Sequence, residues 1–188
     1  KRLNHDFASK FATNRDRHLG AMYNNPEWMT DAPEFEDTNF MLSALNAYGV
    51  LEDDSTKRWA KAFLIAPAIR VIFELSLLAL DKSCDEIHLP NIGVSAKHKE
   101  NVSYVHRLFK NNKFQDYLQA GRIVFDTYQE AHSVIENTDF GESVEYSSLG
   151  SHKSMKDYDI DTIMRLSNDA VLFAMLCQQY VQFKKQGV

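Results

Sequence analysis

The feature that most constrains the fold is residues 57–80, KRWAKAFLIAPAIRVIFELSLLAL, where residues 62–80 are almost wholly apolar. This pattern predicts a long helix in the core of the protein. At helical spacing, its largest side chains form one seam, made of Trp59, Phe63, Ala66, Phe73, Leu77 and Leu80. Arg70 falls on that seam and Glu74 follows one turn later. An oppositely charged pair inside the most apolar helix is therefore the first candidate for a polar site.

Residues 62–80 are also about as long as a membrane-spanning helix, which needs roughly 20 residues. Two charged residues near the middle would each cost about 2.5–3.5 kcal/mol on insertion, so we expect a buried core helix and no membrane. Cys84 and Cys177 lie in no CxxC pattern, which favours a reducing cytoplasm. Residues 1–11 show no signal-peptide pattern. The chain starts at Lys1, which is consistent with trimming or with a piece of a longer protein.

Helical periodicity recurs along the chain, and no segment alternates with the two-residue period of a strand. The expected helices are residues 3–22, 38–50, 57–80, 96–110, 113–136 and 159–185, joined by loops at 23–36, 83–94 and 137–158. Pro67 should kink the long helix or restart it, and Ser95 should cap the helix that follows it. Asp169 is expected on an exposed face of the last helix, paired with Arg165. The sequence thus predicts an all-α, single-domain helical bundle over residues 1–188, with about six helices and a long loop before the last helix.

A cluster of basic side chains lies in residues 97–113, where Glu100 is the only acidic residue. The basic patch is formed by Lys97, Lys99, Arg107 and Lys110, and Tyr104 and Phe114 offer rings for stacking. Such a patch can bind phosphates, although a solvated helix face is the more common explanation. The net charge of −5 excludes attraction of nucleic acid by the whole molecule, so any contact would be local.

The segment 146–152, YSSLGSH, combines hydroxyl groups, an imidazole and a glycine, which suits hydrogen bonding to backbone or to a ligand. Our site hypothesis is that Arg70, Glu74, Tyr146 and His152 meet around one polar pocket. Arg70 would hold an anionic group or the loop backbone, Glu74 would orient Arg70, and His152 would titrate near neutral pH. The alternatives are a structural ion pair and an ordinary surface loop.

Taken together, the Arg70-x-x-x-Glu74 helix and the 146–152 run resemble the HEPN-type helical domains. The resemblance is closest to the poorly characterised branches associated with phage defence and abortive infection, which share an R-x-x-x-E helix and a YxxLSxxxH turn. It implies the helical fold and a nucleotide- or RNA-related setting. The chain departs from the pattern at Gly150, where serine is usual, and at His152, which comes early.

The resemblance does not extend to nuclease activity. Ribonuclease-active HEPN proteins carry an arginine followed by a histidine after four to six intervening residues on one helix. No histidine stands four to seven residues after any of Arg15, Arg17, Arg70, Arg107, Arg122 and Arg165.

The other motifs that carry chemistry are absent. His132 and Glu136 sit one turn apart but would supply only two metal ligands, and the acidic run at 157–161 lacks the glycine and glutamate of a calcium loop. There is no GxSxG, GxxxxGK[ST] or GxGxxG. We therefore expect no catalytic set, no metal and no cofactor.

Three functions remain open from the sequence. The first is a HEPN-like binding or regulatory module that acts in a nucleic-acid, defence or toxin setting through the polar cluster. The second is a nuclease or nucleotide-acting enzyme that uses the same residues, and the third is a structural scaffold that acts through its surface. Acidic residues concentrate in 27–54 and 126–145, which suits a homodimer or a protein partner.

Overall fold

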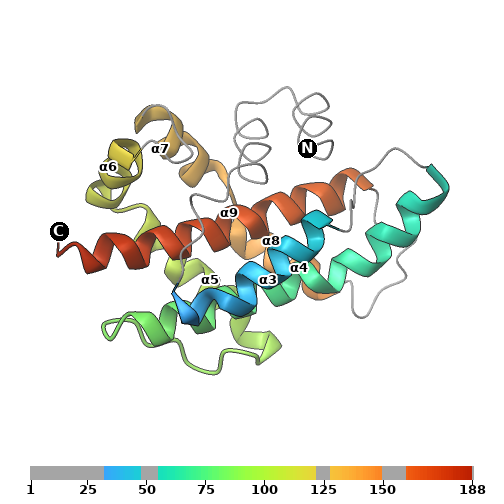
Figure 1. Ribbon diagram of the computed structural model, residues 1–188, viewed down its shortest axis with the longest axis horizontal. Coiled ribbons are helices and arrows are strands. Elements are labelled where there is room, and N and C mark those ends of the chain that lie inside the picture. The colour runs from blue at the N-terminus through green and yellow to red at the C-terminus, as the bar shows by residue number, and fades with distance from the viewer. Residues whose placement is uncertain (1–31, 48–54, 122–127, 150–159, 188) are drawn as a thin grey trace.

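A computed structural model describes residues 32–47, 55–121, 128–149 and 160–187 of the chain, and every regular element in these ranges is a helix (Figure 1). The elements are the 3-10 helix η2 (Pro33–Phe35) and the α-helices α3 (Glu36–Ala47), α4 (Ser55–Ser83), α5 (Ser95–Phe109), α6 (Asn112–Gly121), α7 (Tyr128–Asn137), α8 (Phe140–Leu149) and α9 (Ile160–Lys185). The predicted all-α helical bundle is confirmed. The expected helix at 3–22 lies outside the described residues.

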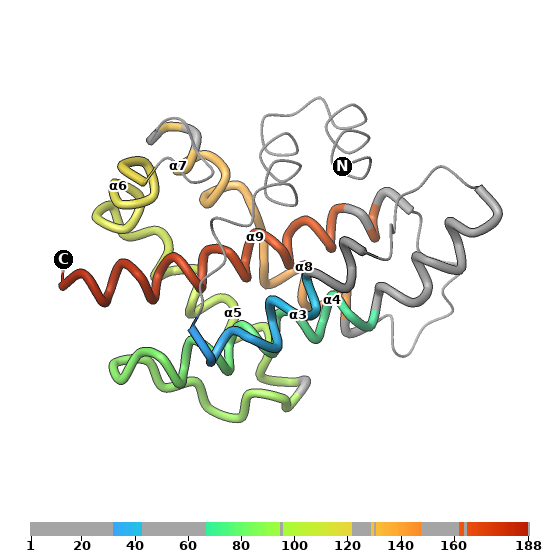
Figure 2. The backbone as a smooth tube through the Cα atoms, in the orientation of Figure 1, coloured from blue at the N-terminus to red at the C-terminus, as the bar shows by residue number. Residues whose placement is uncertain are grey.

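Helix α9 lies at the centre of the bundle and runs along its long axis (Figures 1 and 2). Every residue from Leu166 to Val181 is buried, and α4, α6 and α8 all pack against this helix. A helix buried on all sides is usually apolar all round. This one instead carries buried polar side chains, namely Ser167, Asn168, Asp169, Gln178 and Gln179.

Hydrogen bonds to neighbouring helices offset the cost of burying two of these side chains, Asp169 and Gln178. The Ser143 hydroxyl on α8 donates to Asp169 Oδ2 at 2.6 Å, and Gln178 Nε2 donates to Asn39 Oδ1 on α3 at 2.7 Å. Arg165 Nη1 lies 3.8 Å from Asp169 Oδ2. The expected exposure of Asp169 is therefore wrong, because its side chain is 2% exposed and faces α8.

Helix α4 is a major part of the core but not its centre. It continues from Ser55 to Ser83 through Pro67, so the alternative of a helix that restarts at the proline is wrong. Of the predicted seam, Phe73, Leu77 and Leu80 are fully buried, and the side chains of Trp59, Phe63 and Ala66 lie outside the described residues. Another face of α4 stays open, with Val71 36% and Leu78 38% exposed.

Four phenylalanines from four different helices hold the core together. Phe173 of α9 lies with its ring centroid 5.0 Å from Phe73 of α4, 5.7 Å from Phe109 of α5 and 5.4 Å from Phe140 of α8. All four side chains are fully buried. Rings at these separations add attraction beyond the area that they bury. This cluster fixes α5, which carries the surface described below, relative to the rest of the bundle.

Three expected element boundaries are corrected. The predicted helix over 113–136 is two described helices, α6 and α7, with residues 122–127 outside the described ranges. The predicted loop at 137–158 contains α8. Ser95 is the first residue of α5 and not its cap, since Val94 occupies the N-cap position and makes no side-chain capping bond.

Candidate functional site

Helices α4 and α5 are joined by a cluster of Arg70, Glu74 and His98. Arg70 Nε donates to Glu74 Oε1 at 2.8 Å, so the pair expected from the sequence is present. His98 Nε2 lies 3.1 Å from the same oxygen, but its N–H does not point at the oxygen well enough for a hydrogen bond. The sequence did not single out His98, because its neighbour Glu74 belongs to another helix.

The cluster is unevenly buried. The side chains of Arg70 and Glu74 are 21% and 24% exposed, whereas His98 is 2% exposed. Burial lowers the pKa of His98; the charge of Glu74 opposes this effect and the charge of Arg70 adds to it. The imidazole is therefore neutral at pH 7. A general base must reach its substrate, and a ring this enclosed suits a tie between α4 and α5 better than catalysis.

The other two residues of the hypothetical pocket are placed differently. Tyr146 lies on α8 with 40% of its side chain exposed. Ser147 beside it is buried, and its hydroxyl donates to the carbonyl of Val144 within the same helix at 2.8 Å. His152 lies outside the described residues. The four-residue pocket therefore stays a prediction.

Three of the four cations in the predicted basic patch are paired with carboxylates. The pairs are Lys97 with Glu100 at 2.6 Å, Lys99 with Glu145 at 2.5 Å and Lys110 with Glu136 at 2.7 Å. The hydrogen bond that Lys99 donates to Glu145 raises the pKa of Lys99, and the bond that Lys110 donates to Glu136 lowers the pKa of Glu136. Arg107 differs, since no carboxylate of the described residues lies within ion-pair distance of its guanidinium. The patch presents one open cation instead of four.

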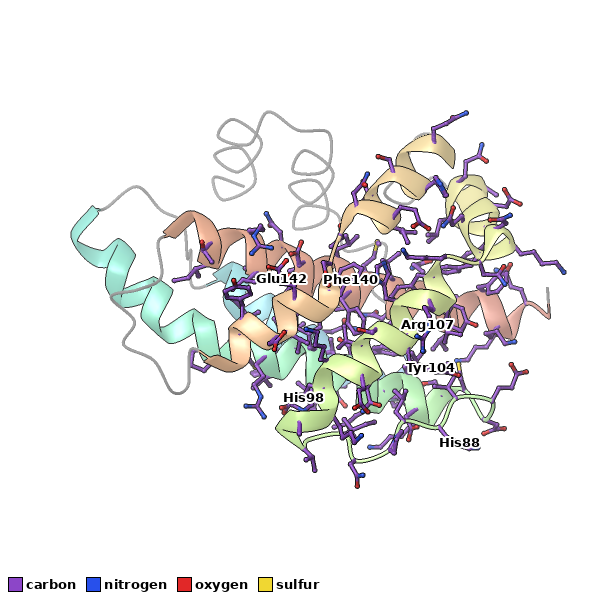
Figure 3. The ribbon with its side chains drawn as sticks, turned by 180° about the vertical axis from the view of Figure 1, so that it is seen from behind. His88, His98, Tyr104, Arg107, Phe140 and Glu142 are labelled. Atoms are coloured by element: carbon purple, nitrogen blue, oxygen red, sulfur yellow. The ribbon has the colours of Figure 1, made fainter. Side chains whose placement is uncertain are left out.

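Arg107 lies at an open groove of about 670 Å³ between α5 and the loop that precedes it. The groove is lined by His88, Leu89 and Pro90 of the loop and by Ala96, Lys99, Glu100, Asn101, Ser103, Tyr104 and Arg107 of α5. Figure 3 shows Tyr104 and Arg107 along α5, with His88 on the loop below them. The Arg107 guanidinium carbon lies 5.9 Å from the centroid of the Tyr104 ring, within the range of a cation–π contact.

The loop wall of the groove is fixed in place. The backbone N–H of Leu89 donates to Asp81 Oδ1 at 2.7 Å, and Asn101 Nδ2 donates to the carbonyl of Pro90 at 3.1 Å. The loop turns through Asn91 and Gly93, both with positive φ (55° and 96°), a conformation that glycine and asparagine adopt most readily. A wall held in this way needs little reordering when a ligand binds.

Comparisons of the chain with protein-family models, with curated proteins and with solved structures found no match. The chemistry of the groove is thus argued from its own residues. Within the described ranges, no three His, Cys, Asp or Glu side chains gather closely enough to hold a metal ion. No helix in those ranges is long and apolar enough to cross a membrane.

Sequence reasoning named Lys99 and Arg107 of the groove but missed the loop side of it. His88, Pro90 and Asn101 carry no recognisable motif, and they meet only because the loop folds back on α5. The one available signal was the Asn91-Ile92-Gly93 turn, which indicates a tight reversal just before the basic helix.

Proposed function

We propose that the protein is a HEPN-like helical binding module that holds an anionic ligand on the outer face of α5 and does not hydrolyse it. One observation carries this proposal: Arg107 stands in a preformed groove without a carboxylate partner among the described residues, while the neighbouring lysines are paired. An unpaired guanidinium in a groove is a ready partner for carboxylate or phosphate.

The setting rests on the resemblance. The Arg70–Glu74 helix and the 146–152 run favour a nucleic-acid or defence-related role in the cytoplasm. The proposal includes a homodimer, which the 72% exposure of Phe40 supports, because a large apolar side chain in solvent is often covered by a partner.

The test compares wild type with Arg107→Gln and with Lys113→Gln, an equal loss of charge at an exposed residue that does not line the groove. Each protein is incubated with total RNA and with a panel of nucleotides, and both retention and degradation are measured. We expect retention by wild type and Lys113→Gln, weaker retention by Arg107→Gln, and intact ligands throughout. Equal retention by all three proteins would contradict the assignment to the groove.

A nuclease or nucleotide-acting enzyme that uses the same predicted cluster is the second candidate, favoured by the Arg70–Glu74 ion pair at 2.8 Å, whose side chains are 21% and 24% exposed and so can be reached from solvent. The same incubation separates the two functions. Turnover that disappears in both Arg70→Ala and His152→Ala, with the fold intact by circular dichroism, would overturn the binding-only proposal.

A further inference from the structure

The charges around the groove restrict the size of its ligand. A nucleic-acid strand binds through several phosphates, each neutralised by a cation. Among the described residues that line the groove, Lys99 is already paired with Glu145, which leaves Arg107 as the open permanent cation. Glu142 and Asp139 add further negative charge beside Lys99, and both raise its pKa. A long polyanion would meet one open cation and several carboxylates, so the surface favours a ligand with a single anionic group.

The volume of the groove also favours a small ligand. Sites for small molecules typically have volumes of about 300–1,000 Å³, and the groove of about 670 Å³ falls within that range. Its lining offers both a cation and apolar surface. Arg107 supplies the cation at one end of the α5 face, while Leu89 and Pro90 supply an apolar wall, and the Tyr104 ring lies beside Arg107.

The geometry points to a small organic anion as the ligand of the groove: a flat ring that bears one carboxylate or phosphate group. The anionic group binds the Arg107 guanidinium, whose fork of N–H donors matches either group. The ring lies against the apolar wall and Tyr104. This inference rests on the proposed function, because it names the ligand of the same groove, and it replaces a nucleic-acid strand with a small molecule.

Each probe in the test isolates one part of this chemistry. Adenosine monophosphate carries a ring and a phosphate, and indole-3-acetate a ring and a carboxylate; adenosine has the ring without the anion, inorganic phosphate has the anion without the ring, and a short oligoadenylate represents a strand. Affinity is measured by calorimetry and by saturation-transfer NMR. The variants are Arg107→Gln and the charge-matched control Lys113→Gln.

We expect one or both of the ring-bearing anions to bind more tightly than adenosine or phosphate alone. Arg107→Gln should weaken that binding about tenfold or more, because a hydrogen-bonded charge pair is lost, while Lys113→Gln should bind as wild type does. Preference between the two anions then identifies phosphate or carboxylate as the natural group.

The results that would contradict the inference differ from those that would contradict the proposed function. If oligoadenylate binds more tightly than adenosine monophosphate and Arg107→Gln weakens it, the proposed function stands and the small-ligand inference falls. If ring-bearing anions bind equally well to Arg107→Gln, the assignment of the groove is wrong. If no probe binds wild type, both the inference and the proposed function fall.

Discussion

Replacement of Glu74 by alanine tests whether the Arg70–Glu74–His98 cluster is a structural tie. Glu74 Oε1 lies 2.8 Å from Arg70 Nε and 3.1 Å from His98 Nε2, so Glu74→Ala removes a polar neighbour from both side chains. The substitution affects the Arg70 and His98 side chains differently. Arg70 is 21% exposed and can be hydrated, whereas the imidazole is 2% exposed and cannot.

The contacts of Glu74 and Arg70 determine which substitution costs more stability. A partly exposed i, i+4 ion pair contributes about 0.3–0.5 kcal/mol. His98 lies beside Glu74 without a hydrogen bond to it, so the loss of the neighbouring carboxylate should cost about 1 kcal/mol at most, the low end for a buried polar group. Glu74→Ala should therefore lower the free energy of unfolding by about 1.5 kcal/mol at most. Arg70→Ala leaves the carboxylate beside His98 and should cost about 0.5 kcal/mol or less.

The assay is urea unfolding followed by circular dichroism at pH 7. Glu136→Ala is the control, because Glu136 and Lys110 form an ion pair that is 36% and 34% exposed and should matter little. Neither Arg70 nor Glu74 lines the groove, so anion binding should survive both substitutions. The reasoning is refuted if Arg70→Ala destabilises the protein as much as Glu74→Ala, or if Glu74→Ala behaves like the control.

Three further outcomes follow from the packing and from the buried histidines. Phe173→Ala should cost about 3–5 kcal/mol in urea unfolding, because its ring contacts three other helices, whereas Phe40→Ala, at a side chain that is 72% exposed, should change stability little. Burial lowers the pKa of both His98 and His106 in the folded state, so the unfolded chain binds more protons below about pH 6.5. The free energy of unfolding should therefore fall as the pH drops from there towards the folded pKa values, with a slope of at most about 1.4 kcal/mol per pH unit for each histidine. A flat profile from pH 7 to 5 would contradict this. Ser143→Ala removes the hydroxyl that donates to the buried carboxylate on α9 and should cost about 1–3 kcal/mol, measured against Ser143→Thr, which keeps a donor.

Periodicity located the helices whose apolar residues fall on one face, but it ranked them wrongly. Residues 62–80 are the most apolar stretch, yet α9 is the more enclosed helix. The difference arises because α9 buries Asp169 and Gln178, whose hydrogen-bond partners come from α8 and α3. A one-dimensional pattern counts such residues as solvent-facing, since it contains no record of their tertiary partners.

Helix α8 was not predicted, for a related reason. Its sequence, FGESVEYSSL, is rich in serine and contains a glycine, a composition typical of loops. In the structure, Phe140 and Val144 are fully buried one turn apart, and Gly141 allows a close approach to α5: an added Cβ there would lie 2.9 Å from the Ser103 hydroxyl. Packing against α5 and α9 therefore outweighs the weak helix propensity of the segment.

The failure to predict α8 also explains why the pairing of the basic residues could not be seen in the sequence. At 3.6 residues per turn, His106 and Lys110 fall on the side of α5 that contacts α7. Lys99 lies at the edge of the groove, where its ammonium group is bonded to Glu145 of α8. Arg107 follows a different row, through Ala96 and Tyr104, which faces the groove.

The division of α5 into two rows makes a direct prediction. Lys110→Gln and Arg107→Gln each remove one positive charge from the same end of α5, three residues apart. If the charge of the patch acted as a whole, the two substitutions would weaken anion binding equally. Because Lys110 is already bonded to Glu136 and faces away from the groove, we expect Lys110→Gln to leave binding unchanged. Only Arg107→Gln should reduce the affinity for the ring-bearing anions, so equal losses in the two variants would show that a diffuse field, and not the groove, attracts the ligand.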